Sequence, residues 1–134
     1  MVSREIPPIK LYFPREDINE IEECIRKILK SGMLTLGQYT KAFEEEFANF
    51  HRVKHSIAVS SGTSALEIAL RCIGIQEDDE VIVPTNTFSA TAAAVVFSGG
   101  KPVLTDIDPE TLCINTQEVE EHLTSKTKAV IVVH

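Results

Sequence analysis

The residues with the clearest chemical potential lie where an apolar run ends and a helical pattern begins. Ser60-Ser61-Gly62-Thr63 follows the apolar run 56–59 and opens an amphipathic segment. Gly62 allows a close backbone approach to a ligand, and the free N–H groups and dipole at a helix start favour an anion. The same pattern is also typical of a helix cap formed by Ser61 or Thr63. The turn lacks the Gly-Lys-Ser/Thr ending of a Walker A loop and the three glycines of a dinucleotide fingerprint.

Four other residues with chemical potential follow the later apolar runs. Phe88 stands on a polar loop, where its ring could stack on a flat heterocycle or join the hydrophobic core. Asp106 and Asp108 could form a carboxylate pair, although Asp-x-Asp-Pro is typical of a turn whose side chains bond nearby amides. His134 is a lone histidine, and the sequence offers it no partner at metal-ligand spacing.

Composition and charge exclude several classes of function. The chain of 134 residues has 20 acidic and 13 basic residues, a net charge of −7, and no Trp. Such an acidic protein repels a polyphosphate backbone, so nucleic-acid binding is disfavoured. No apolar run approaches the ~18 residues of a membrane span, and no signal peptide is visible. Three widely spaced cysteines give no metal-ligand pattern and fit a reducing compartment, so we expect a cytoplasmic protein without a bound metal.

The apolar pattern predicts an α/β fold. Helical spacing of apolar residues indicates helices at about 15–30, 40–50, 64–73, 90–97 and 116–123. Short, continuously apolar runs stand at 56–59, 80–83, 102–105 and 129–133. Runs of this kind are typical of parallel strands covered on both faces. We therefore expect a three-layer, mostly parallel sheet of four strands with a leading helical arm, and ligands outside the carboxyl ends of the strands.

These segments, in this order, resemble the DegT/DnrJ/EryC1/StrS family of sugar aminotransferases, which are pyridoxal-phosphate enzymes of fold type I. The resemblance covers residues 13–134, and the order and spacing of its motifs carry it. The motifs include Ser31-Gly32, Thr35-Leu36-Gly37, Phe43-Glu44, Val59–Ala65, Asp79–Ile82, Pro84–Thr91, Pro102-Val103, Asp106-Ile107-Asp108, Lys126–Ala129 and Val133-His134. The resemblance implies pyridoxal 5′-phosphate as the cofactor.

The resemblance also implies roles for individual residues. The cofactor-binding residues would be Ser61, Gly62, Thr63 and Phe88. Of these, Gly62 and Thr63 would hold the phosphate, and Phe88 would stack on the pyridine ring. The residues on the side of the sugar substrate would be Thr35, Gly37 and His134. Asp106 and Asp108 match a family motif, but we expect their role to be structural.

By the same resemblance, the chain looks like the first third of a family sequence. Residues 1–55 would form a helical arm with a substrate-side loop, and residues 56–134 the first half of the cofactor-binding domain. The Schiff-base lysine and the aspartate that pairs with the pyridine nitrogen would come later, so we expect no catalytic residue and no activity in these residues alone. The family strand order predicts that 56–60 does not pair with the other three runs.

Three functions remain open at this point. The leading one is a pyridoxal-phosphate-dependent aminotransferase that acts on a nucleotide-linked keto-sugar, with glutamate as amino donor and a homodimer as the complete form. The second is a sugar dehydratase of the same family, in which histidine replaces the lysine. The third is a noncatalytic phosphate-binding or regulatory module.

Overall fold

The computed structural model describes residues 9–134, so the first eight residues of the expected arm lie outside the described part. The chain divides into two compact units, one that ends at Ala58 and one that begins at Val59. Each unit is described by itself. Among residues 9–134, no helix has both the length and the apolar character that crossing a membrane requires.

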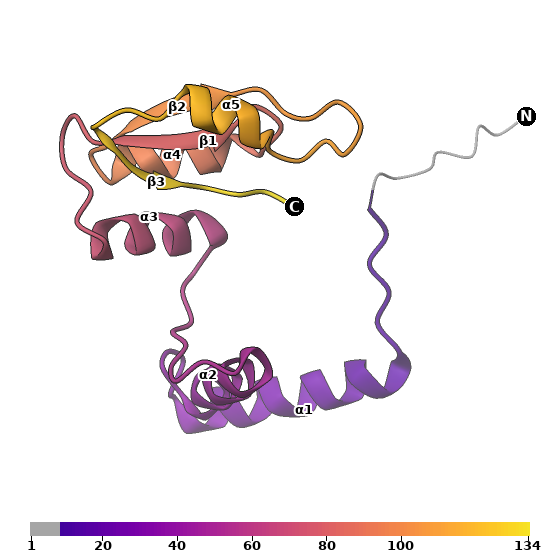
Figure 1. The fold of residues 1–134 in the computed structure, drawn as a ribbon. Coiled ribbons are helices and arrows are strands. Elements are labelled where there is room, and N and C mark those ends of the chain that lie inside the picture. Colours follow the sequence, from indigo (N-terminus) through magenta and orange to yellow (C-terminus); the bar gives the residue numbers. More distant parts are fainter. Residues whose placement is uncertain (1–8) are drawn as a thin grey trace, which may run out of the picture. The chain divides into compact units, whose positions relative to one another are not determined.

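The first unit contains two helices, α1 (Arg15–Ser31) and α2 (Gln38–His51) (Figure 1). The predictions of helices near 15–30 and 40–50 are therefore confirmed. Acidic residues in the first turn of α1 and Lys30 in its last turn complement the helix dipole. Gly32 ends α1 with a φ of 71°, a left-handed conformation that glycine adopts without a Cβ penalty.

The apolar run 56–59 does not form a strand, so the prediction of four strands within this chain was wrong. The sheet has three strands, and this run pairs with none of them, which confirms the expectation taken from the family strand order. A strand needs a neighbouring backbone for its N–H and C=O groups. In the described residues, Oε1 of Glu44 in α2 accepts a hydrogen bond from the N–H of Ala58 at 2.8 Å. The hydroxyl of Ser56 also donates to the carbonyl of Glu44 at 2.7 Å.

The second unit is a parallel sheet with helices, as predicted. Strand β1 (Glu80–Pro84) lies between β2 (Lys101–Thr105) and β3 (Thr127–Val130), in the order β2-β1-β3 (Figure 1). Both pairings are parallel. The helices are α3 (Gly62–Cys72), α4 (Ser89–Phe97) and α5 (Thr116–Glu121). The fourth apolar run was expected to be extended to Val133, but β3 ends at Val130, which is the last residue in register with β1.

The core of this unit surrounds β1. Val81, Ile82 and Val83 are each fully buried. Because consecutive side chains of a strand point to opposite faces, both faces of β1 are covered. Val81 and Val83 pack with Leu70, Ile75, Ala94 and Val95, and helix α4 contacts both β1 and β2. This arrangement fixes the carboxyl end of β1, from which the loop to Phe88 leaves.

Candidate cofactor site

The turn before α3 combines a helix cap with free backbone donors. Ser61 is extended, and its hydroxyl accepts a hydrogen bond from the N–H of Ser64 at 3.1 Å. Its carbonyl accepts from the N–H of Ala65 at 3.0 Å. Ser61 is therefore the helix cap. The N–H groups of Gly62 and Thr63 open the helix, where no intrahelical acceptor exists for them.

The structure brings Gly62, Thr63 and Phe88 together around one open hollow of about 540 Å³. Ala65, Leu66, Ala90 and Thr91 complete the described lining. The ring of Phe88 is 79% exposed, so it does not belong to the core of this unit. Two segments that lie 25 residues apart in the sequence thus contribute a helix-start turn and an aromatic ring to the same surface.

This hollow fits a phosphorylated, flat heterocycle. The N-terminus of a helix favours an anion, because its free N–H groups point outward along a favourable dipole. A Cβ placed on Gly62 would meet no other atom within 4 Å in the described residues, so the turn is open to a ligand. An exposed phenylalanine offers its face to an aromatic ring. Pyridoxal phosphate has both parts, a phosphate and a pyridine ring.

Asp108 has a structural role, as expected for an Asp-x-Asp-Pro turn. Its Oδ1 accepts hydrogen bonds from the N–H groups of Glu110 and Thr111, at 2.9 and 2.8 Å, and from the Thr111 hydroxyl at 3.2 Å. The backbone N–H groups of Thr111 and Glu110 lower the pKa of this carboxyl below its ordinary value. Neither Asp106 nor Asp108 lines the hollow.

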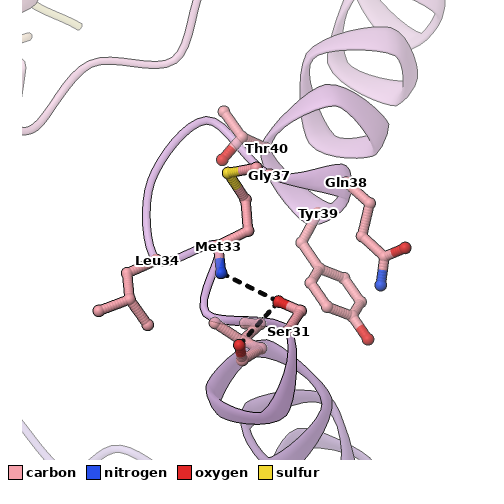
Figure 2. A pocket seen from close by; sticks show the side chains of 8 residues that line it. Ser31, Met33, Leu34, Gly37, Gln38, Tyr39 and Thr40 are labelled. Carbon is pink, nitrogen blue, oxygen red and sulfur yellow. Dashed lines mark hydrogen bonds between the residues drawn. The ribbon is translucent and has the colours of Figure 1, made fainter.

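The expected substrate-side residues are not among the residues that line this hollow. Gly37 lines a smaller pocket of about 300 Å³ between the end of α1 and the start of α2, whereas Thr35 is exposed beside it. Figure 2 shows the thioether of Met33 directed toward Gly37, and the Ser31 hydroxyl bonded to the N–H of Met33 at 3.1 Å. His134 is the last, exposed residue of the second unit. The substrate side remains a prediction for all three residues.

Sequence reasoning missed two threonines next to Phe88. The hydroxyl oxygens of Thr87 and Thr91 lie 2.8 Å apart, and Thr91 is 6% exposed although it lines the hollow. The sequence signal that could have found them is their spacing, because Thr87 and Thr91 are four residues apart, about one helical turn, at the start of a predicted helix. Such pairs can bridge a helix start.

Comparison with known proteins shows the family of this chain. Residues 15–134 match the DegT/DnrJ/EryC1/StrS aminotransferase family. The chain belongs to this family. One family relative is the 3-oxo-glucose-6-phosphate:glutamate aminotransferase of Bacillus subtilis, which is 38% identical over 95% of this chain and 29% of its own length.

Solved structures of family members have the same fold as this chain. NtdA from Bacillus subtilis, determined with the bound cofactor PMP, gives a TM-score of 0.87 at 36% identity, over 98% of this chain and 32% of the other. GDP-4-keto-6-deoxymannose-3-dehydratase, determined with a trapped PLP-glutamate adduct, gives 0.75 at 31% identity, over 83% of this chain and 30% of the other. The cofactor of the family is pyridoxal phosphate or its amino form. The chain spans about a third of the length of these relatives.

Proposed function

We propose that this chain belongs to an aminotransferase that moves the amino group of glutamate to a keto-sugar. The observation that carries the proposal is the hollow where Gly62 and Thr63 meet the exposed ring of Phe88. Bound pyridoxal phosphate would supply the electron sink for amino transfer, and the protein supplies binding, orientation and electrostatics.

The described residues would hold the cofactor by its two ends. The N–H groups of Gly62 and Thr63 and the Thr63 hydroxyl donate to the phosphate, and each bond is strengthened because the acceptor is charged. Phe88 stacks on the pyridine ring and shields that face from water. Ser61 supports the turn because its hydroxyl accepts the N–H of Ser64, and the hydroxyl proton would remain available to the phosphate.

We further propose that the lysine which links to the cofactor lies outside these 134 residues. None of the residues described around the hollow is a lysine. Lys101 and Lys128 stand at the amino ends of β2 and β3, the opposite edge of the sheet from the loop that carries Phe88. On this proposal the complete protein is active as a cytoplasmic homodimer, and the 134 residues alone are inactive.

The substrate is proposed to be a keto-sugar that carries a nucleotide. The name of the dehydratase relative contains a GDP-linked keto-sugar, whereas the Bacillus aminotransferase is named for a keto-sugar phosphate with glutamate. Both names contain a keto-sugar that carries a charged group, which is GDP in one and a phosphate in the other. A GDP-linked and a phosphorylated keto-sugar are therefore the first substrates to compare.

The test is turnover by the complete gene product, loaded with pyridoxal phosphate. The protein is given ¹⁵N-glutamate with either GDP-4-keto-6-deoxymannose or 3-oxo-glucose-6-phosphate, and the products are analysed by mass spectrometry. Transfer of ¹⁵N to the sugar supports the proposed aminotransferase activity. A preference for the GDP-linked sugar supports the proposal that the substrate carries a nucleotide. Loss of water from the sugar without ¹⁵N would support the second candidate, a dehydratase. If the protein catalyses neither reaction on either substrate, the proposal is contradicted.

A further inference from the structure

We propose that Thr91 and Thr87 form a hydroxyl bridge that positions the ring of Phe88 over the cofactor hollow. The inference rests on the proposed function, because it assumes that Phe88 contacts the cofactor. It assigns a positioning role to two residues that the proposed function does not use.

The ring of Phe88 has little support from its neighbours. It is 79% exposed in this unit, so packing does not hold it in one orientation. Phe88 is also the N-cap residue of α4, and its side chain makes no capping hydrogen bond. The backbone at this residue, where φ is −69° and ψ is 140°, sets the direction of the Cα–Cβ bond from which the ring extends.

Thr91 fixes that backbone from both sides. Its N–H donates to the carbonyl of Phe88 at 2.9 Å. Its hydroxyl oxygen lies 2.8 Å from the hydroxyl oxygen of Thr87, the residue immediately before Phe88. The N–H of Thr87 in turn donates to the carbonyl of Thr85 at 3.1 Å. Residues on both sides of the ring-bearing position are thus tied to the first turn of α4.

The surroundings strengthen this bridge. Thr91 is 6% exposed, and Thr87 is half-buried, so water competes weakly for the two hydroxyl groups. The contact joins the residue before the N-cap to the third residue of the helix, so it ties the incoming chain to the first turn of α4. Since Thr91 also lines the hollow, the bridge joins the wall of the site to the loop that carries its aromatic ring.

The test compares two probes on the complete apo-protein, pyridoxal phosphate and inorganic phosphate. Thr91→Val preserves the shape of the side chain and removes the hydroxyl. We expect it to weaken pyridoxal phosphate binding about three- to tenfold, the effect of one hydrogen bond, and to leave inorganic phosphate affinity unchanged. Thr91→Ser should restore binding. Ser89→Ala removes an exposed hydroxyl from the same turn and should change neither affinity. If Thr91→Val does not fold, Thr87→Val removes the same bond from its other end.

A double substitution separates this inference from the proposed function. In a Phe88→Ala background, Thr91→Val should have no further effect on pyridoxal phosphate affinity, because the ring it positions is gone. A full additional loss there, an equal loss of inorganic phosphate affinity, or no effect of Thr91→Val in the unaltered protein would each overturn the inference. If Phe88→Ala itself leaves pyridoxal phosphate affinity unchanged, the assigned role of Phe88 in the proposed function fails as well.

Discussion

The two compact units bury their apolar residues to very different extents. In residues 9–58, Ala48 is the one buried residue, and the apolar faces of both helices are open to solvent. Ile21 and Ile25 of α1 are 44% and 50% exposed, although they repeat at helical spacing. In residues 59–134, by contrast, five apolar side chains around β1 and α4 have no exposed surface.

The contrast shows what an amphipathic pattern does and does not determine. A stripe of apolar residues predicts that a helix will form and that one face needs cover. It does not say which surface supplies that cover. For the second unit the cover lies nearby in the sequence, in α3 and α4. For α1 and α2 we propose that the covering surface lies in the complete protein, including a second copy in the homodimer.

The largest effect should come from the core of the second unit. Ile82→Ala removes a fully buried side chain and should lower the free energy of unfolding by about 2–5 kcal/mol. Ile21→Ala, a matched change on the exposed face of α1, should cost less than about 1 kcal/mol in a monomer. Urea unfolding measures both. Equal costs would mean that the face of α1 is covered, and would break the comparison.

Gly100→Ala should have the next largest effect. A Cβ at this position would lie 2.7 Å from Cγ2 of the buried Ile75 and 3.3 Å from both Cγ1 of Val95 and the carbonyl of Asp79. Such overpacking should cost about 1–3 kcal/mol of the free energy of unfolding. Gly37→Ala in the first unit is the control, because its Cβ would make only ordinary contacts of 3.5 Å with Met33. A stable Gly100→Ala variant would show that this corner of the core can relax.

Glu44→Ala tests the hydrogen bond between the Glu44 side chain and the N–H of Ala58. Loss of the acceptor for the N–H of Ala58 should cost about 1 kcal/mol and should speed hydrogen exchange at that amide. Glu46→Ala removes an exposed carboxylate from the same helix and should leave that exchange rate unchanged. Unchanged exchange in both variants would mean that something other than Glu44 protects this segment.

The smallest effect concerns the protonation of Asp108. The N–H groups of Thr111 and Glu110 hold its pKa below the ordinary 3.8, so the folded state favours the carboxylate. The stabilisation is therefore present at neutral pH and is lost as the pH falls through that lowered pKa. An NMR titration should give a pKa below 3.8 for Asp108, and Thr111→Ala, which removes the hydroxyl donor but keeps both N–H groups, should raise it only slightly. A normal pKa would contradict the hydrogen-bonded turn.

Much of this fold could be predicted from local pattern. The spacing of isoleucines gave α1, and the continuous run Val81-Ile82-Val83 indicated a strand covered on both faces. The run 56–59 was wrongly predicted to form a strand, because a strand depends on a partner that local sequence does not specify. In the described residues this run contacts Glu44, twelve to fourteen residues away, through two hydrogen bonds.

The candidate site was predictable in its parts and less so in its assembly. Gly62 and Thr63 follow from the chemistry of a helix start, but local pattern alone left Phe88 between a core and a surface role. Only the family resemblance selected the stacking role for Phe88. The bridge between Thr87 and Thr91 escaped prediction because it depends on the rotamers of two hydroxyl side chains, which sequence does not fix.

The most direct test of the central claim, that Gly62, Thr63 and Phe88 form the cofactor site, is the affinity of Thr63→Val for pyridoxal phosphate. In the complete protein, loss of one hydrogen bond to the charged phosphate should weaken binding by about 1–3 kcal/mol. Thr63→Ser keeps the hydroxyl and should bind like the unaltered protein. An unchanged affinity in Thr63→Val, measured by equilibrium titration of the apo-protein, would remove Thr63 from the site and contradict the account.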